Sequence, residues 1–424
     1  MEGSANVATN DASLFDVAWC REQFPALSRL FRGKPVVHFD GPAGTQVARR
    51  VVDAVGRYLV HNNANGNGLF VTSRESDTAM AEARQAMADL LGAGDPETIV
   101  FGPNMTSLTF ALSCALAKTW QPGDHVVLTR LEHDANVTPW VMAARQASAH
   151  VEHVSVRRED GTLNMDDLAA KLSRQPRLVA VTGASNALGS LTPLPQIVRL
   201  AHDAGALVFV DGVHLAPHRL IDVERWGCDF LACSVYKFFG PHVGVLWGRR
   251  ELMAKLPACK LRPVPDTLPS RWMHGTPNQE GIAGASAAVE YLAALGRHCR
   301  PEATGRRAAL EAAFEAIAAY ERRLSAKLLS ELAKRPEIKV WGITDPARLD
   351  ERVPTLALTH RRLPPRKLAA DLGNRGIFVW HGNFYALPLT EALGLEPEGV
   401  LRVGLVHYNT GEEIDRLMET LDQL

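Results

Sequence analysis

The stretch FLACSVYKFFGPHVGVLWG, residues 230–248, places Lys237 between two short apolar runs. Runs of this kind are typical of strands buried in a sheet, so we expect this lysine close to the core rather than on an exposed loop. Burial lowers the pKa of an ammonium group, and a neutral lysine amine is the nucleophile that forms Schiff bases with aldehydes. The sequence therefore predicts Schiff-base chemistry at Lys237.

Other polar residues also come directly after apolar runs. They are Glu132 and His133 after VVLT, Ser185 and Asn186 after LVAVTG, and Asp211 and His214 in LVFVDGVH. Ligands of open α/β sheets bind beyond the carboxyl ends of the strands, so these side chains are candidates for a site. Considered singly, His133 is better explained as a surface or half-buried imidazole, and Asp211 as a helix cap or turn former.

Taken together, Asp211 and Lys237 meet the requirements of a pyridoxal phosphate site. The cofactor needs an amine for its aldehyde, and it works as an electron sink only if its pyridine nitrogen stays protonated, which a buried carboxylate ensures. A phosphate cup is also needed. The segment TIVFGPNMTSLTF ends a strand and opens a helix at residues 104–107, including Thr106 and Ser107, where free N–H groups and hydroxyls can hold a phosphate or simply cap the helix.

The elements that position these residues follow from the alternation of apolar runs and amphipathic stretches after residue 97. The runs TIVFG, HVVLT, VEHVSV, RLVAVTG, ALVFVDG and FLACS read as strands, with helical patterns between several of them. This alternation predicts βαβ units, and hence a mostly parallel sheet with helices on both faces. After Pro301 a long Ala/Glu/Arg helix pattern and then VPTLALTH, GIFVW and LRVGLVHY predict a second, smaller α+β domain.

Six ordered motifs resemble the class V aminotransferase family of fold type I pyridoxal phosphate enzymes, in its cysteine desulfurase-like branch. They are LEHDANVTPW, ASNALGSLTP, VFVDGVHLAPH, FLACSVYKFFGPHVGVLWG, HGTPNQEGIAG and LRVGLVHYNTGEEIDRL. The resemblance implies a seven-stranded, mostly parallel sheet in a large domain at 26–298 and a small domain at 299–424, with which an N-terminal arm at 1–25 associates.

The resemblance also assigns roles to individual residues. Lys237 would form the Schiff base, Asp211 would pair with the pyridine nitrogen, and His133 would stack on the ring. Asn186 would bind the 3-oxygen, near His214, which replaces a frequent glutamine. The remaining positions imply a phosphate cup of Thr106, Ser107, Ser234 and Tyr236, with Thr276 reaching the phosphate of a second subunit in a homodimer with shared sites. Arg402 would bind the substrate α-carboxylate, and Asn186 and Tyr385 would also contact the substrate.

The sequence departs from the desulfurase branch at one position that matters for chemistry. Desulfurases carry a nucleophilic cysteine on a loop of the small domain, and here the corresponding loop FVWHGNFYALPL has Tyr385 at that position and Trp380 in place of a common arginine. The chain has no cysteine after Cys299. Because a tyrosine cannot carry sulfane sulfur, we do not expect persulfide chemistry.

These features favour an enzyme that acts on a small α-amino acid by β-elimination of the C–S lyase type. Transamination and racemisation share the first proton loss at Cα and remain alternatives. A nicotinamide-dependent dehydrogenase would need a G-x-G-x-x-G after its first strand, which the sequence lacks. A non-catalytic scaffold would have no need to keep Lys237, Asp211, His133 and Arg402 together.

The composition of the chain argues against several classes of binding partner. The chain has 424 residues, with 46 Lys+Arg against 47 Asp+Glu and a net charge of −1, and no basic block suggests a nucleic acid or membrane partner. Its six cysteines are scattered without C-x-x-C spacing, so we expect reduced thiols and no metal site. The N-terminal segment lacks the pattern of a signal peptide and no run is long enough to span a bilayer, which favours a cytoplasmic protein.

Overall fold

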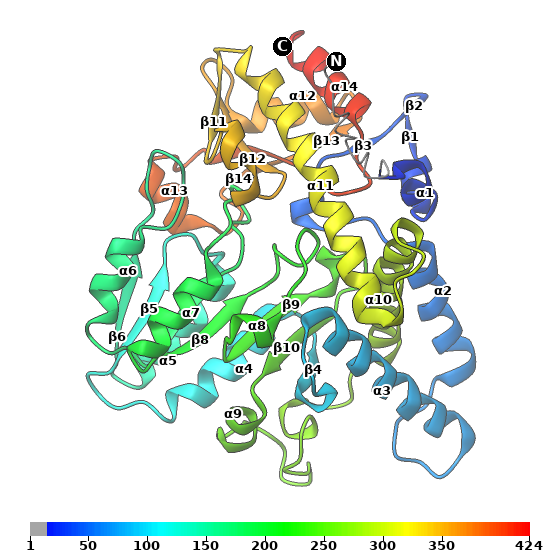
Figure 1. Cartoon of the computed structure of the whole chain (residues 1–424), viewed down its shortest axis with the longest axis vertical. Coiled ribbons are helices and arrows are strands. Elements are labelled where there is room, and N and C mark those ends of the chain that lie inside the picture. The colour runs from blue at the N-terminus through cyan, green and yellow to red at the C-terminus, as the bar shows by residue number, and fades with distance from the viewer. Residues whose placement is uncertain (1–14) are drawn as a thin grey trace, which may run out of the picture.

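The computed structural model describes residues 15–424, and its centre is a seven-stranded sheet in the order β4-β10-β9-β8-β7-β5-β6 (Figure 1). Its strands are β4 (Ile99–Gly102), β5 (His125–Thr129), β6 (His150–Val154), β7 (Leu178–Thr182), β8 (Leu207–Asp211), β9 (Phe230–Ser234) and β10 (Gly244–Gly248). Neighbours from β6 to β9 pair in parallel, whereas β10 is antiparallel to both β4 and β9. The predicted mostly parallel seven-stranded sheet is therefore confirmed.

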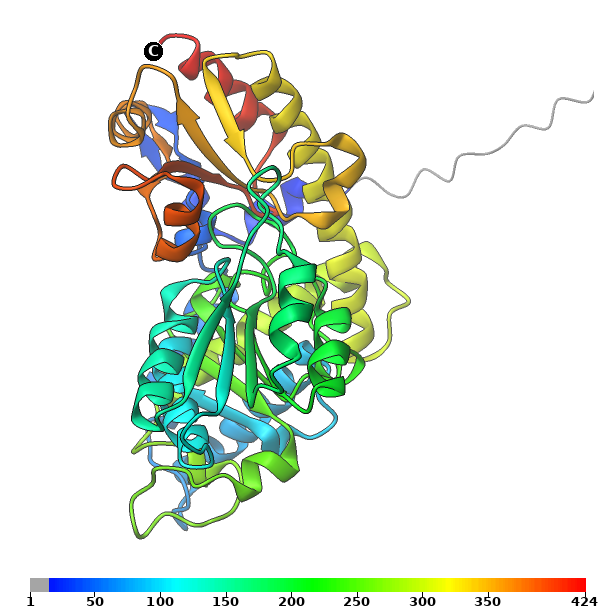
Figure 2. The same ribbon diagram turned by 90° about the vertical axis from the view of Figure 1, so that its left-hand side faces the viewer.

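The central strands form because both of their faces are buried. All five residues of β7 are buried, and Leu178 and Ala180 pack into one apolar core while Val179 and Val181 pack into another. Successive side chains of a strand point to opposite faces, so a strand covered on both sides reads as a continuous apolar run. Figure 2 shows the helices of this unit on either side of the sheet.

The helices differ in length and in how they begin. They are α1 (Val17–Glu22), α2 (Arg49–Arg57), α3 (Val71–Leu91), α4 (Met105–Ala117), α5 (Thr138–Gln146), α6 (Met165–Leu172), α7 (Leu194–Asp203), α8 (Val223–Trp226), α9 (Arg250–Lys255), α10 (Gln279–Cys299), α11 (Gly305–Ala333), α12 (Pro365–Gly373), α13 (Leu387–Leu393) and α14 (Gly411–Leu421). The predicted long helix after Pro301 is α11. The final helix starts with a capping box between Thr410 and Glu413, a strong N-terminal signal.

A second, four-stranded sheet lies at the other end of the molecule, in the order β11-β12-β15-β14 (Figure 2). Its strands are β11 (Ile338–Trp341), β12 (Thr355–His360), β15 (Val400–Gly404) and β14 (Trp380–Gly382). The run GIFVW, expected as one strand, is divided: β13 (Ile377–Phe378) pairs with β3 (Val37–His38), and β14 joins the sheet. The smaller α+β unit is thus present, with one strand split between two partners.

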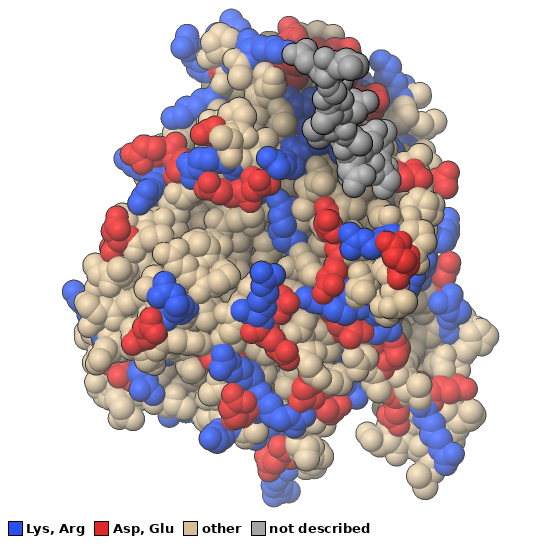
Figure 3. Space-filling view, viewed as in Figure 1, with Lys and Arg blue, Asp and Glu red and all other residues tan. Residues whose placement is uncertain are grey.

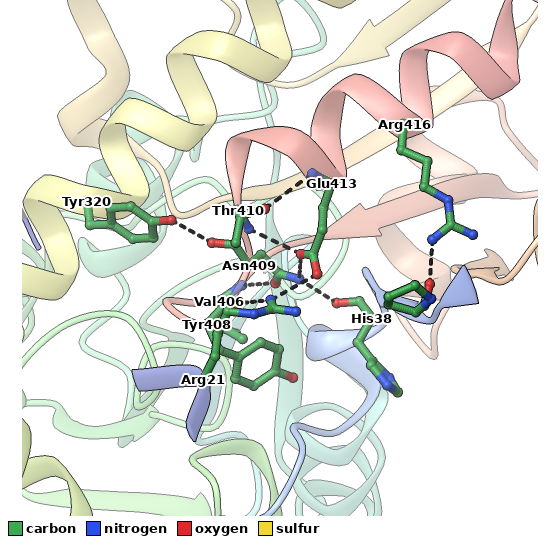
Figure 4. A network of polar contacts seen from close by, with 10 residues as sticks. Arg21, His38, Tyr320, Val406, Tyr408, Asn409, Thr410, Glu413 and Arg416 are labelled. Atoms are coloured by element: carbon green, nitrogen blue, oxygen red, sulfur yellow. Dashed lines mark hydrogen bonds and ion pairs between the residues drawn. The ribbon is translucent and has the colours of Figure 1, made fainter. Parts of the chain in front are cut away.

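The N-terminal helix is held against C-terminal elements by a polar network (Figure 4). Arg21 of α1 donates to the carbonyl of Tyr408 at 2.6 Å and to Glu413 Oε1 at 2.9 Å. Asn409 Nδ2 donates to the other carboxyl oxygen of Glu413 at 2.9 Å and to the carbonyl of His38 at 3.0 Å. These contacts join α1 and β3 to α14.

The domain boundaries remain an interpretation. Residues 1–14 of the expected N-terminal arm lie outside the described residues. The boundary between 298 and 299 falls in the last turn of α10, and β3, which lies within 26–298, pairs with β13 from 299–424.

The surface in Figure 3 carries basic and acidic residues interspersed, without a broad area of one sign on this face. From residue 15 onward, no helix combines the length and apolarity needed to cross a membrane.

Candidate active site

A cavity of about 930 Å³ is lined both by carboxyl ends of strands in the main sheet and by residues of β14, β15 and the loop after β14. Eleven of the twelve predicted site residues line it, namely Thr106, Ser107, His133, Asn186, Asp211, His214, Ser234, Tyr236, Lys237, Tyr385 and Arg402. The exception is Thr276, which is exposed in the segment before α10. Its predicted contact with a second subunit remains a prediction.

Lys237 lies in the short helix Val235–Lys237 that follows β9 directly. Its Nζ donates to the carbonyls of Pro42 at 2.5 Å and Ala43 at 3.2 Å, in the turn Gly41–Ala43. Burial, reinforced by the charge of Arg402, lowers the pKa of Lys237 to about 7. A substantial share of this amine is therefore neutral near pH 7, as a nucleophile or base requires.

Asp211 is the last residue of β8 and is only 3% exposed. Its Oδ1 accepts a hydrogen bond from the backbone N–H of Val213 at 2.8 Å. Burial raises the pKa of Asp211 to about 6, although that hydrogen bond and the charge of Lys237 favour the ionised form. A protonated nitrogen base placed against this carboxyl would hold it ionised and would itself be held protonated.

His133 caps the turn Asp134–Asn136, and its Nδ1 accepts from the backbone N–H of Ala135 at 3.0 Å. We assign the hydrogen of the neutral ring to Nε2 on the basis of this contact. Burial, together with the charge of Lys237, lowers the pKa of His133 to about 4, so the ring is uncharged at neutral pH. A neutral, flat imidazole that lines the cavity is suited to stacking.

Glu132 stabilises the turn Asp134–Asn136, a role that the sequence analysis did not assign to it. Its fully buried carboxyl accepts from Thr129 Oγ1 at 2.6 Å, from Asn136 Nδ2 at 2.7 Å and from the Thr182 N–H at 2.9 Å. Burial raises the pKa of Glu132 to about 8. Its contacts tie the end of β5 to the end of β7, a role that sequence cannot reveal because glutamate is normally exposed.

The start of α4 forms one wall of the cavity. Asn104 caps the helix by accepting from the N–H of Ser107 at 2.9 Å, and the hydroxyl of Ser234 accepts from the N–H of Met105 at 2.9 Å. Thr106 and Ser107 line the cavity. The Ser107 hydroxyl donates to Asn104 Oδ1 at 3.0 Å, so the helix dipole and the Thr106 hydroxyl are the groups available to an anion there. The hydrogen bond between Ser234 and Met105 holds the end of β9 against the start of α4, which brings the residues expected to bind a phosphate together.

Tyr236 lies next to a residue that the sequence did not single out. Its ring stacks on the ring of His242 with centroids 4.8 Å apart and planes 15° apart, and both line the cavity. Burial raises the pKa of the Tyr236 phenol, so at neutral pH it remains a hydrogen-bond donor.

His214 is anchored by the C-terminal unit. Its Nε2 lies 3.0 Å from Thr355 Oγ1 in β12, and its ring meets that of His218 edge-on at 5.3 Å. His218 Nδ1 in turn lies 3.0 Å from both carboxyl oxygens of Glu321 in α11. Burial and the neighbouring His218 lower the pKa of His214 well below its ordinary value, which keeps this imidazole neutral.

Arg402 projects from β15 and is 5% exposed. Its Nη1 donates to the carbonyl of Asn186 at 2.8 Å, and its guanidinium lies 3.9 Å from the centroid of the Phe384 ring. Burial lowers the pKa of Arg402 to about 9, which leaves the group charged at neutral pH. Asn186 Nδ2 donates to the carbonyl of Phe384 at 2.9 Å, while its buried Oδ1 has no partner.

The loop that carries Tyr385 belongs to the C-terminal unit and forms part of the cavity wall. Tyr385 is 71% exposed, its ring lies 5.3 Å from that of His133, and its carbonyl accepts from the N–H of Asp134 at 2.7 Å. Trp380 is 53% exposed and pairs in register with Arg402. Among the described residues that line the cavity there is no cysteine.

The residues present fit pyridoxal phosphate. A helix start with hydroxyls suits the phosphate, a buried carboxyl suits the ring nitrogen, and a partly neutral lysine suits the aldehyde. The orphaned Oδ1 of Asn186 marks a polar position in this region that a ligand could satisfy.

Comparisons with known proteins point to one family. The family model "Aminotransferase class-V" matches residues 37–417. A cysteine desulfurase of Dickeya dadantii (strain 3937) is 32% identical over 419 residues, covering 95% of each chain, and one of Enterobacter sp. (strain 638) is 32% identical over 429 residues, covering 97% of this chain and 98% of its own. The solved structure of the cysteine desulfurase CsdA from Escherichia coli superposes with a TM-score of 0.82 at 28% identity, covering 97% of this chain and 98% of its own.

Proposed function

The chain belongs to the class-V aminotransferase family of pyridoxal phosphate-dependent enzymes, and we propose that it acts on a small α-amino acid by β-elimination of the C–S lyase type. In this reaction the substrate loses its Cα proton and then the group on Cβ. With L-cysteine and water the balanced products are hydrogen sulfide, ammonia and pyruvate. The cysteine desulfurases among its relatives support chemistry at a carbon–sulfur bond.

Pyridoxal phosphate, when bound, supplies an electron sink for the pair left at Cα. The site residues divide the remaining tasks. Asp211 would keep the pyridine nitrogen protonated, the start of α4 with Ser234 and Tyr236 would hold the phosphate, and His133 would stack on the ring. Asn186 would bind the 3-oxygen, next to His214.

Lys237 and Arg402 act on the substrate itself. The guanidinium of Arg402 binds the α-carboxylate through its in-plane N–H groups, which fixes the orientation of the Cα–H bond. The amine of Lys237 would take the Cα proton. Burial supports this role because it lowers the pKa of the amine to about 7.

The observation that carries elimination rather than sulfur transfer is Tyr385. A desulfurase of the type that the chain resembles needs a thiolate on this loop, and a phenol cannot form a persulfide. The cysteines elsewhere are poor substitutes. Burial raises the pKa of the Cys20 thiol and of the Cys228 thiol to about 12, and none of the described residues lining the cavity is a cysteine.

Product analysis after incubation with L-cysteine tests the proposal. We expect sulfide, ammonia and pyruvate in equal amounts, and an intact protein mass that does not change. Lys237→Ala provides the control, since it should abolish all three products. Stoichiometric alanine together with a sulfur adduct on the protein would instead establish a desulfurase. An α-keto acid formed with retention of the β-substituent would establish transamination, and a D-amino acid would establish racemisation.

A further inference from the structure

We propose that Phe384 is a positioning residue for the substrate carboxylate, because its ring and its main chain together fix the guanidinium of Arg402. The inference rests on the proposed function, in which Arg402 binds that carboxylate. Phe384 lies in the loop between β14 and α13, a stretch whose aromatic residues the sequence places beside the site without assigning Phe384 a contact with Arg402.

Three contacts form a closed triangle. Arg402 Nη1 donates to the carbonyl of Asn186 at 2.8 Å, Asn186 Nδ2 donates to the carbonyl of Phe384 at 2.9 Å, and the Phe384 ring lies 3.9 Å from the Arg402 guanidinium carbon. Each residue thus contacts the other two through different groups. Moving any one of the three residues would therefore change two of the three contacts.

The hydrogen bond of Arg402 goes to a main-chain carbonyl, and its guanidinium carbon lies over the face of an aromatic ring. A carboxylate partner would compete with an incoming substrate carboxylate, whereas a ring face does not. Bidentate carboxylate recognition uses guanidinium N–H groups, and the contact with the Phe384 ring uses the charge of the cation rather than an N–H···O bond. Phe384 therefore stabilises the cation without placing a carboxylate against it.

The backbone at Phe384 and Tyr385 adopts an unusual conformation that fits a role in positioning Arg402. Its φ is +57° and that of Tyr385 is +59°, in the left-handed region that bulky residues rarely adopt. The conformation is held from both sides, because Asn186 binds the Phe384 carbonyl and the N–H of Asp134 binds the Tyr385 carbonyl at 2.7 Å. Strain of this kind persists where surrounding contacts determine the backbone, most often at functional sites.

Binding of propionate and of uncharged propionamide to the holoenzyme tests the inference by calorimetry. In Phe384→Leu the affinity for propionate should fall about twofold to thirtyfold, the range expected for losing a cation–π contact, while propionamide binding stays unchanged. Phe384→Trp keeps an aromatic face and should retain propionate affinity. Unchanged propionate affinity in Phe384→Leu, or equal losses in both variants, would overturn the role of the ring.

A second series avoids any disturbance of folding. Difluoro- and pentafluoro-phenylalanine at position 384 keep the shape of the side chain but progressively weaken the negative face of the ring, so propionate affinity should fall in the same order. A propionate affinity that stays constant or rises with increasing fluorination would contradict the inference. If propionate binding to the native holoenzyme is absent or unaffected by Arg402→Lys, the assignment of Arg402 itself fails, which is a different outcome from failure at Phe384.

Discussion

At Lys237, burial and the charge of Arg402 both act to lower the pKa of the amine, to about 7. Only the neutral amine can accept the Cα proton, so activity should be lost when pH falls below this value. We expect kcat to rise about tenfold per pH unit below about 7 and to level off above it. A kcat profile that is flat between pH 6 and 8 would assign the proton to another group.

In the proposed function, Asp211 acts on the cofactor rather than on the substrate. Replacement by asparagine keeps its size but removes the charge that holds the pyridine nitrogen protonated, so Asp211→Asn should bind pyridoxal phosphate and lose about a hundredfold or more in kcat. Absorption of the bound cofactor and single-turnover kinetics would separate binding from chemistry. Full activity in this variant would refute the pairing.

At the scale of the elements, the cavity wall at the start of α4, which we propose holds the phosphate, depends on the close approach of β10 to α4. A Cβ at Gly244 would lie 2.3 Å from the carbonyl carbon of Asn104, the cap of α4, so only glycine fits there. Gly244→Ala should move the start of α4 away from the cavity. Losing a charge-assisted bond to the phosphate corresponds to a fall in cofactor affinity of about tenfold to hundredfold, measurable by titration of the apoprotein.

Gly373 provides the matched control for this substitution. It is the last residue of α12, and a Cβ there would meet no atom within 4 Å. Gly373→Ala should leave cofactor affinity unchanged and stabilise the protein slightly, by up to about 1 kcal/mol, in thermal unfolding. Equal losses of cofactor affinity in both variants would show that the effect at Gly244 is not local to α4.

At the scale of the whole molecule, the cavity is assembled from two units. The end of β8 supplies Asp211 and the short helix after β9 supplies Lys237, while β15 supplies Arg402 and the loop after β14 supplies Tyr385. Helix α11 also connects the units, because Glu321 contacts His218, which lies against His214 in the cavity wall. Substrate binding therefore depends on how the two units are held together.

The surface between α2 and α3 bears on the predicted homodimer. Val60 is 75%, Leu69 89% and Phe70 58% exposed, an accumulation of large apolar side chains that is typical of an interface. We expect a dimer in light scattering at micromolar concentration, weakened by the double substitution Val60→Asp, Leu69→Asp. Met142→Asp, at an exposed apolar residue of α5, should have no effect. A native monomer would contradict the shared sites and the role expected for Thr276.

Much of the fold and part of the site could be predicted from the sequence, because strands buried on both faces leave continuous apolar runs and their ends carry the ligands. The runs that became β7, β8 and β9 placed Asp211 and Lys237 at neighbouring strand ends in this way. The split of GIFVW between β13 and β14 could not be predicted, because a short apolar run does not specify which partner strand it pairs with.

Only the tertiary structure decided the contacts between segments far apart in the chain. The pairing of Arg402 with Phe384 and Asn186, the burial of Glu132 and the stacking of Tyr236 on His242 depend on side-chain directions and on the burial created by other elements. Sequence determines which groups are available and the local elements that present them. Their distances and ionisation follow from packing, because desolvation and Coulomb interactions depend on the surroundings in three dimensions.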